Sequence, residues 1–321
     1  MREEPWITGG ATDPDPTARQ YTVGTPDGRI LGVAEYGPQD GAPIFSLHGT
    51  PGSRYGGPPP ELPTLYDDLF VRVIGYDRPG YGLSTRHPGR SVADCAADVA
   101  AIADRLDIER FAVTGGSGGG PHCLAVAALL PERVTRVACV VGVAPMDQEE
   151  FEFVEGMTQG NVDEFTWSVA GEEVLRPQAE RLAAADLERM SKGDIGLGEA
   201  YQMSEGDLEI MSRPAYAPRI VRMMQEAYRT GVDGWVDDDL VFVKPWGFTL
   251  DTITAPAMVW FGVDDTLVPR QHGEWLARNV PGAQVVRMSG GHMELANRVP
   301  DLLTWLTGGA APDDAVAGVP A

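Results

Sequence analysis

Positively charged residues are scarce in this 321-residue chain, which has 25 Lys and Arg against 47 Asp and Glu and a net charge of −22. Proteins that bind nucleic acids or anionic membrane surfaces do so through clustered Lys and Arg side chains. We therefore expect neither a nucleic-acid partner nor a membrane partner. We interpret the acidity as a feature that favours solubility rather than as a cation-binding property.

Cysteine is also rare, and long apolar runs are absent. Cys95, Cys123 and Cys139 are odd in number, lie far apart and have apolar neighbours, which indicates reduced core residues and not a disulfide framework or a metal site. No apolar run reaches the ~18 residues of a membrane span. Residues 1–5 lack the apolar segment of a signal peptide. These absences predict a cytoplasmic protein.

The most informative segment that is present is the Gly-Gly-Ser-Gly-Gly sequence of residues 115–119. It follows a strand-like run at residues 110–114 and precedes an Ala- and Leu-rich helical stretch at residues 121–130. A Gly-x-Ser-x-Gly between a strand and a helix is typical of a nucleophile elbow, in which the serine occupies a strained turn and the glycines avoid steric clashes. We therefore predict that Ser117 is a catalytic nucleophile.

Strand-like and helix-like segments alternate along most of the chain. This predicts an α/β fold with a mostly parallel sheet, helices on both faces and an antiparallel start. The predicted strands are residues 20–25, 29–36, 43–49, 71–77, 110–114, 134–143, 257–262 and 284–288. The predicted core helices are residues 91–106, 121–130, 271–279 and 294–306.

The segment from residue 146 to residue 245 interrupts this alternation, because it has helical periodicity and no convincing strand. We expect an inserted helical cap over the carboxyl edge of the sheet, and ordinary helices of a three-layer fold are the alternative. The predicted organisation is a mobile lead-in at 1–17, a core in two parts at 18–145 and 246–308, the cap or lid at 146–245, and a mobile tail at 309–321.

A serine nucleophile needs a histidine base that is oriented by a carboxylate. Candidates for both follow Ser117 in the order typical of an elbow serine. Asp265 comes after the predicted strand 257–262, and His292 lies on a Gly-rich loop after the predicted strand 284–288. Because the carboxyl ends of parallel strands share one edge of a sheet, both side chains can meet the serine there. We predict Ser117, Asp265 and His292 as the catalytic residues.

Other acids and histidines fit these roles less well. Asp264 lies one position from the preferred spacing, Asp147 after an earlier strand is the fallback acid, and Asp77 sits among turn formers that favour a loop-tying role. The remaining histidines are expected to have no catalytic role: His87 and His272 as exposed residues, His122 as a packed residue of the helix after the elbow, and His48 as part of a loop.

Acyl transfer also needs two backbone N–H groups that hold the oxyanion. Gly118 follows the nucleophile, and Thr50 lies on the loop after an early strand, where Pro51 has no N–H. Thr50 and Gly118 are therefore the predicted oxyanion hole. Further candidates for the substrate pocket are Gly49, Arg54 and Gly116. For Arg54, a position that faces solvent is an equal alternative.

Several motifs in this order make the chain resemble the α/β-hydrolase fold superfamily from about residue 20 to residue 308. They are residues 48–52 (His-Gly-Thr-Pro-Gly), residues 77–84 (Asp-Arg-Pro-Gly-Tyr-Gly-Leu-Ser), the elbow at 115–119, residues 262–269 with Asp265, and Gly291-His292. The resemblance implies an eight-stranded, mostly parallel sheet, a helical lid after the sixth strand, the Ser-His-Asp triad named above, and no metal or organic cofactor.

The chain also departs from parts of that superfamily. Epoxide hydrolases and haloalkane dehalogenases have an aspartate at the elbow, so Ser117 excludes both. Proline-releasing peptidases, which the chain resembles in its capped layout, usually have a tryptophan where this chain has Gly118. Gly116, Gly118, Gly119 and Gly120 predict an open floor around the nucleophile, with room for a bulky acyl or alcohol group.

The favoured hypothesis is a carboxylesterase-like serine hydrolase that cleaves an ester or lactone of an apolar small molecule through an acyl-enzyme. The alternatives are an aminopeptidase, amidase or C–C bond hydrolase with the same triad, and a non-catalytic ligand-binding protein on this scaffold. A peptidase would need cap acids for the substrate's ammonium group. Glu149, Glu150, Glu152 and Glu155 are candidates, and a solvated face is their plainer interpretation. The oligomeric state is left open.

Overall fold

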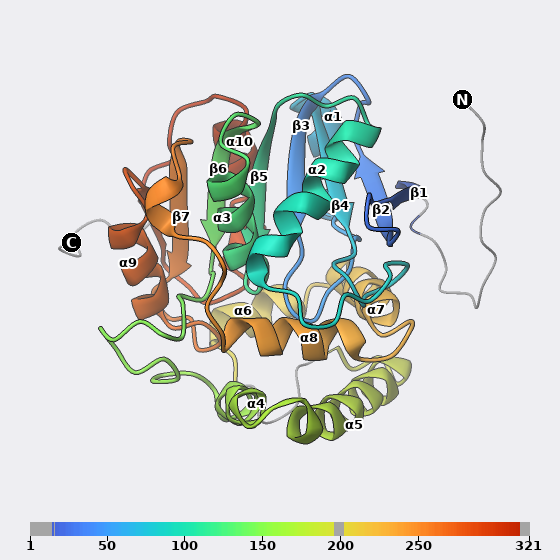
Figure 1. Ribbon diagram of the computed structural model, residues 1–321, viewed down its shortest axis with the longest axis vertical. Coiled ribbons are helices and arrows are strands. Elements are labelled where there is room, and N and C mark those ends of the chain that lie inside the picture. The colour runs from blue at the N-terminus through green and yellow to red at the C-terminus, as the bar shows by residue number, and fades with distance from the viewer. Residues whose placement is uncertain (1–14, 16, 196–201, 315–321) are drawn as a thin grey trace.

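A computed structural model describes residues 15, 17–195 and 202–314, and its central feature is an eight-stranded sheet (Figure 1). The strand order is β1-β2-β4-β3-β5-β6-β7-β8. Strand β2 is antiparallel to both β1 and β4, and the other neighbouring strands are parallel. The predicted mostly parallel sheet with an antiparallel start is confirmed.

The strands are short, and most of their residues are buried. Their bounds are β1 Arg19–Gly24, β2 Ile30–Tyr36, β3 Ala42–Leu47, β4 Val71–Tyr76, β5 Phe111–Gly116, β6 Val134–Val140, β7 Ala257–Gly262 and β8 Gln284–Met288. The prediction that β6 continues to residue 143 is wrong. Val141 has a left-handed backbone with φ 45°, which ends the extended strand.

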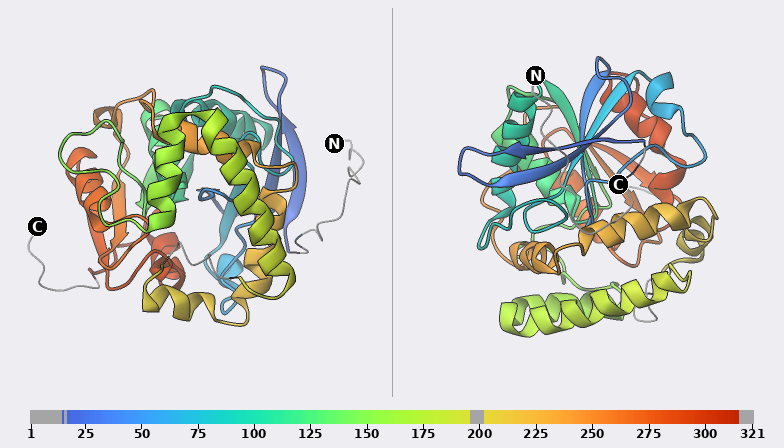
Figure 2. Two further views of the ribbon diagram at one scale, coloured as in Figure 1. Left: turned by 90° about the horizontal axis from the view of Figure 1, so that it is seen from below. Right: turned by 90° about the vertical axis from the view of Figure 1, so that its right-hand side faces the viewer.

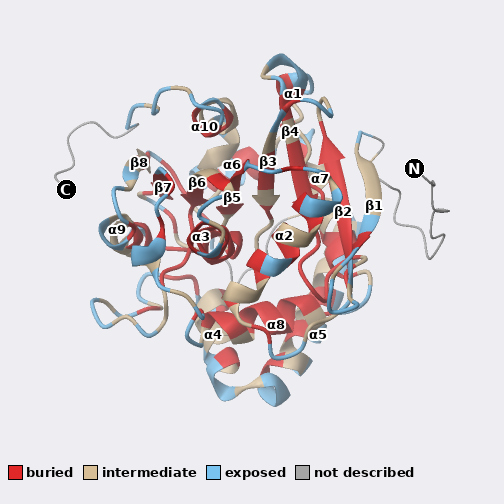
Figure 3. Ribbon diagram, turned by 45° about the horizontal axis from the view of Figure 1, so that its top comes forward, coloured by how far each residue is buried: buried red, intermediate tan, exposed pale blue. Residues whose placement is uncertain are grey.

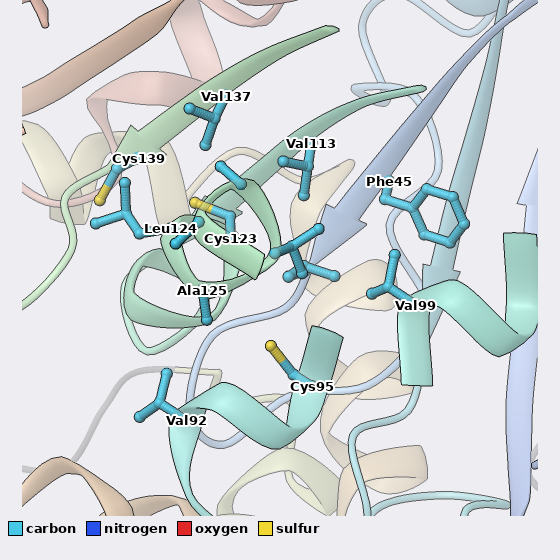
Figure 4. Packing of buried hydrophobic residues seen from close by; sticks show 14 of the residues in the cluster. Phe45, Val92, Cys95, Val99, Val113, Cys123, Leu124, Ala125, Val137 and Cys139 are labelled. Carbon is cyan, nitrogen blue, oxygen red and sulfur yellow. The ribbon is translucent and has the colours of Figure 1, made fainter. Parts of the chain in front are cut away.

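Helices cover both faces of the sheet. Helices α2 (Cys95–Arg105), α3 (Gly119–Leu129) and α9 (Arg270–Asn279) pack on one face, and α1 (Leu65–Asp68) and α10 (Val299–Leu306) pack on the other. Side chains alternate between the faces along each strand. Figure 4 shows the first face, where side chains of β3, β5 and β6 lie beside α3 in one apolar cluster.

Between β6 and β7, the described residues form helices and no regular strand. These helices are α4 Gln159–Ala170, α5 Glu172–Ser191, α6 Glu205–Met211, α7 Tyr216–Ala227 and α8 Asp233–Phe242. They lie beyond the carboxyl ends of the parallel strands, with α8 next to the strands and α4 and α5 outermost (Figures 1 and 2). They form the segment for which the sequence predicts an inserted helical cap, and we call them the cap helices below. The division of the chain into units at 18–145, 146–245 and 246–308 stays a prediction.

Helix α8 connects the cap with the core. Most of its residues are buried, because α4 and α5 pack against it from outside (Figure 3). Trp235 and Val236 at its start belong to an apolar cluster of cap residues. Val241 and Phe242 at its end belong to the cluster beside the sheet. Helix α8 therefore contributes both to the apolar cluster of the cap and to the cluster on one face of the sheet.

One predicted helix is divided in the structure. Residues 294–306 form a short 3-10 helix, η3 (Glu294–Asn297), followed by α10. Arg298 between them leaves the helical region, with φ −121° and ψ 10°. Pro300 then occupies the first turn of α10, where its missing N–H costs no hydrogen bond.

The cysteine prediction is confirmed, because Cys95, Cys123 and Cys139 are buried free thiols. Most of the predicted lead-in and tail, namely residues 1–14, 16 and 315–321, lies outside the described residues. Of the helices that the structure describes, none is both long and apolar enough to cross a membrane.

Candidate active site

Ser117 sits on the sharp turn between β5 and α3. Its backbone is left-handed with φ 53°, an uncommon conformation for a residue other than glycine. The turn needs glycine on both sides: a Cβ atom on Gly115 would lie 2.0 Å from the carbonyl oxygen of Gly119, and one on Gly119 would lie 2.3 Å from that of Leu47. The backbone thus has the strained turn that the glycine pattern predicts.

Asp265 and His292 are in direct contact. The Nδ1–H group of His292 donates to Oδ2 of Asp265 at 2.7 Å. Oδ1 of Asp265 accepts the backbone N–H groups of Leu267 and Val268, each at 2.9 Å. The Asp265 side chain is fully buried, and that of His292 is 10% exposed. With its proton held on Nδ1, the imidazole presents Nε2 as the acceptor that a general base needs.

Two carboxylates act on the charge of His292. Burial disfavours the imidazolium, but the attraction and hydrogen bond of Asp265, followed by the attraction of Asp207, raise the pKa of His292 above its usual value. The imidazole therefore holds an added proton readily. It is neutral, and able to accept a proton, only above this raised pKa.

Ser117, Asp265 and His292 follow β5, β7 and β8, whose carboxyl ends lie at one edge of the sheet. The structure brings Asp265 and His292 together and places Ser117 on the same edge. Among the described residues, no hydrogen bond within 3.5 Å joins Oγ of Ser117 to His292. In many enzymes this contact tightens only when the substrate binds.

Thr50 and Gly118 lie against each other beside the serine. A Cβ atom on Gly118 would be 2.3 Å from Oγ1 of Thr50, and Thr50 and Ser117 line the same cavity. Neither backbone N–H group donates a hydrogen bond to another residue in the part of the chain that the structure describes. Two amides of this kind beside a serine hydroxyl can hold an oxyanion.

The loop that carries Thr50 is held by a buried ion pair between Arg78 and Asp238. Arg78, which follows β4, donates to the carbonyl oxygens of His48 and Gly49. It pairs at 2.5 Å with Asp238 of α8, and both side chains are fully buried. The Thr50 hydroxyl also donates to Asp238, at 2.7 Å. A cap residue therefore fixes the candidate oxyanion loop.

Asp238 is ionised inside the protein. Burial opposes its charged form, but Arg78 and then Arg90 outweigh burial and hold the pKa of Asp238 well below its usual value. Arg90 lies 2.6 Å from the carboxylate, and the Tyr81 hydroxyl donates to it at 2.9 Å. The charge of Asp238 is thus compensated on several sides.

A cavity of about 120 Å³ opens at Ser117 below the cap. The cap contributes apolar side chains such as Leu182 and Met224 to its wall, together with the carboxyl groups of Glu164 and Asp186. No Lys or Arg is among the described residues that line it. Elsewhere in the described ranges, no group of His, Cys, Asp and Glu is arranged to hold a metal ion.

Arg54, a predicted pocket residue, faces neither the cavity nor solvent. It is only 2% exposed and pairs with Asp77 at 2.6 Å and with Glu226 of α7 at 2.5 Å. Both alternatives for Arg54 are therefore wrong, because a core acid and a cap acid compensate its charge in the interior.

The predicted open floor around the nucleophile exists at one glycine only. Gly116 borders open space, since the nearest atom to an added Cβ lies 4.0 Å away, but Gly116 is not among the residues that line the cavity. Gly49 packs against Ser117 and is not among them either. Added Cβ atoms on Gly118, Gly119 and Gly120 would lie 2.3, 2.3 and 2.7 Å from neighbouring atoms. These three glycines allow close packing and leave no free room.

The histidines outside the candidate site are packed more deeply than the sequence indicates. His272 is fully buried, and the prediction that it is exposed is wrong. Its Nδ1 accepts the N–H of Ala144 at 3.1 Å, Nε2–H donates to the carbonyl of Phe153 at 2.9 Å, and burial lowers its pKa to about 4. His122 is buried as predicted, and His87 is half-buried.

The acids that fit the catalytic role less well lie in a loop contact or at the surface. Asp77 ties a loop as predicted, because it accepts the N–H groups of Arg54 at 2.7 Å and Leu83 at 3.0 Å. Asp147 and Asp264 are exposed. The cap glutamates expected on a solvated face are exposed as well: Glu149, Glu150, Glu152 and Glu155.

Sequence reasoning missed the cap acids that lie near the catalytic edge, namely Glu164, Asp186, Asp207 and Asp238. Their neighbours are brought to them by folding and are distant in sequence. One usable signal was the run of three acids at residues 237–239, which lies between the apolar pairs Trp235-Val236 and Leu240-Val241.

Known proteins resemble this chain over stretches of different length. The family model described as alpha/beta hydrolase fold matches residues 42–295. A non-heme chloroperoxidase from Streptomyces lividans is 34% identical over 151 residues, which are 46% of this chain and 54% of that protein. A proline iminopeptidase from Arabidopsis thaliana is 32% identical over 124 residues, which are 37% of this chain and 32% of that protein.

The matched stretch thus spans about half the length of the chloroperoxidase and about a third of the iminopeptidase. Among solved structures, a thermophilic esterase from Thermogutta terrifontis superposes with a TM-score of 0.62 at 20% identity. The match covers 90% of this chain and 98% of the esterase. At this level of identity the likeness shows a common fold.

We expect the imidazole of His292 to titrate above about 6.5, the usual histidine pKa, because Asp265 and Asp207 favour the imidazolium. NMR of the histidine ring protons against pH measures this value. Asp265→Asn should lower it by about one unit or more, since an ion partner is lost. His122, whose pKa burial lowers to about 3, is an internal control that stays neutral. A wild-type value below 6.5, or no change in the variant, would contradict the assignment.

Proposed function

We propose that this chain, which belongs to the α/β-hydrolase fold family, is a serine hydrolase that cleaves a carboxylic ester or lactone of an apolar small molecule. The observation that carries the proposal is the Asp265–His292 pair at the sheet edge that also holds Ser117 on its strained turn. The amides of Thr50 and Gly118 and the partly apolar cavity at the serine support it.

In the first half of the reaction, Oγ of Ser117 attacks the carbonyl carbon of the ester, and its proton passes to Nε2 of His292. Asp265 holds the Nδ1 proton and stabilises the imidazolium that forms. The carbonyl oxygen becomes an oxyanion, which the N–H groups of Thr50 and Gly118 bind. The C–O bond then breaks, the leaving alcohol takes the proton from His292, and the acyl group remains on the serine.

In the second half, a water molecule gives a proton to Nε2 of His292 and attacks the acyl carbon. The same amides bind the second oxyanion. The bond to Oγ breaks, the serine recovers its proton from His292, and the carboxylic acid leaves. The reaction consumes one water molecule and returns the enzyme to its starting state.

A series of p-nitrophenyl esters with increasing acyl length tests this proposal. We expect wild-type turnover with a preference for short acyl groups, because the cavity is small. Ser117→Ala should reduce kcat by about 10⁴-fold or more, since the nucleophile is lost. Ser191→Ala, which changes an exposed serine at the end of α5, is the matched control and should leave kcat unchanged. Absence of turnover in folded wild-type protein, or persistent turnover in Ser117→Ala, would refute the proposal.

A second candidate function is hydrolysis of a substrate with a free amine, as by an aminopeptidase, and the acids of the cavity wall favour it. Glu164 and Asp186 line the cavity together with Ser117. Glu164 accepts the Nε1–H of Trp235 at 2.6 Å. Burial and then the Glu164 carboxylate raise the pKa of the adjacent Asp239 well above its usual value. One relative is named a proline iminopeptidase.

Paired substrates separate this second function from the first. The pair is an amino-acid p-nitrophenyl ester with a free amine and the same ester with the amine acetylated. If the acids bind ammonium, wild-type kcat/KM should favour the free amine, and Glu164→Gln should reduce that preference about tenfold.

The matched control for this comparison is Glu150→Gln, which changes an exposed cap acid and should have no effect on the preference. Equal wild-type kcat/KM for both esters, or an unchanged preference in Glu164→Gln, would exclude the amine-binding function.

A further inference from the structure

A buried acid of the cap binds the loop that carries His292. Asp207 lies on α6, and its side chain is fully buried. Its Oδ2 accepts the backbone N–H of His292 at 3.0 Å, and its Oδ1 accepts that of Met293 at 2.7 Å. The contact joins the cap to the core segment between β8 and α10.

We propose that Asp207 is a positioning residue for His292. Through this residue the cap holds the catalytic base in place, in addition to covering the substrate. The inference rests on the proposed function, in which His292 is the base. Asp207 acts on the backbone and on the charge of His292 without touching the reacting atoms.

The loop is shaped to receive this carboxylate. A Cβ atom on Gly291 would lie 2.1 Å from Oδ2 of Asp207, so a side chain at residue 291 would displace the acid. On the opposite side, a Cβ atom on Gly262 at the end of β7 would lie 2.4 Å from the carbonyl oxygen of Gly290. The Gly290–Gly291 segment is thus held between the sheet and the cap.

Both oxygens of the carboxylate are used, which explains why an acid stands here. Two adjacent backbone N–H groups need two acceptors, and an asparagine would supply one acceptor and one donor. In the described part of the chain, Asp207 has no Lys or Arg ion partner, whereas the buried acids Asp77, Glu226 and Asp238 each have one. Its carboxylate adds to the attraction of Asp265 for the imidazolium of His292.

The groups that face His292 come from three directions. Asp265 binds Nδ1 from the loop after β7, Asp207 binds the backbone from α6, and Ser117 lies across the sheet edge. Glu294 of η3 lies against Gly290 on the same loop. The charge on His292 rises only when a proton is transferred to it, so the attraction of Asp207 strengthens in the transition state.

Asp207→Asn tests the proposal. We expect kcat for the best ester to fall about tenfold while KM changes less than about twofold, because binding of the ground state is not affected. The pH midpoint of kcat/KM should move to lower pH, since the imidazolium loses a favourable charge. NMR titration of His292 should show the same downward shift. Because this titration needs no turnover, it tests Asp207 even if no ester is hydrolysed.

Ser204→Ala is the matched control. The Ser204 hydroxyl accepts the backbone N–H of Asp207 at 3.1 Å and caps α6, so this variant weakens the helix and keeps the carboxylate. It should lower Tm and leave the pH midpoint unchanged. An equal shift of the midpoint in both variants, or no shift in Asp207→Asn, would overturn the proposal.

A measurement on the wild-type protein covers the case in which Asp207→Asn does not fold. Amide hydrogen exchange should be slow at His292 and Met293, because both N–H groups are bonded to a buried acceptor. Fast exchange at both amides would show that the contact is absent and would overturn the proposal.

Discussion

The buried ion pair between Arg78 and Asp238 is the interaction on which the shape of the candidate active site depends. It joins the segment after β4 to α8 of the cap, and the same two side chains bind the carbonyls and the hydroxyl of the loop that carries Thr50. Removal of one partner from such a pair leaves an uncompensated buried charge and typically costs ~3–5 kcal/mol. The observed form of the candidate oxyanion loop therefore depends on contacts with the cap.

Other buried acids of the cap also bind core loops along this edge of the sheet. Three consecutive cap helices, α6, α7 and α8, each bring a fully buried acid to the core. Asp207 binds the loop after β8, Glu226 binds the loop after β3, and Asp238 binds the loops after β3 and β4. The acidity of the chain thus has two parts. Exposed acids such as Glu149 fit the interpretation as a solubility feature, whereas the buried ones connect the cap to the loops of the candidate active site.

Those parts of the site that depend on local backbone constraints could be predicted from the sequence. A strained turn admits few residue types, so the glycines around Ser117 predict it, and strand ends place Asp265 and His292 at one edge. The predicted positions of Arg54 and His272 were wrong because they depend on contacts between residues that are distant in the sequence. A buried polar side chain is stable only with partners, and here these are a cap carboxylate and the carbonyl of a distant loop. The cap acids escaped prediction because the same kind of contact defines them.

Covalent trapping of the serine tests most directly the central claim, that Ser117 is a nucleophile activated by His292. The protein is treated with a fluorophosphonate, and the modified peptide is identified by mass spectrometry. We expect a single adduct on Ser117 in the wild-type protein, and labelling slowed by about 10³-fold or more in His292→Ala, because the hydroxyl loses its base. No adduct on Ser117 in folded protein, or equal labelling rates with and without His292, would contradict the claim.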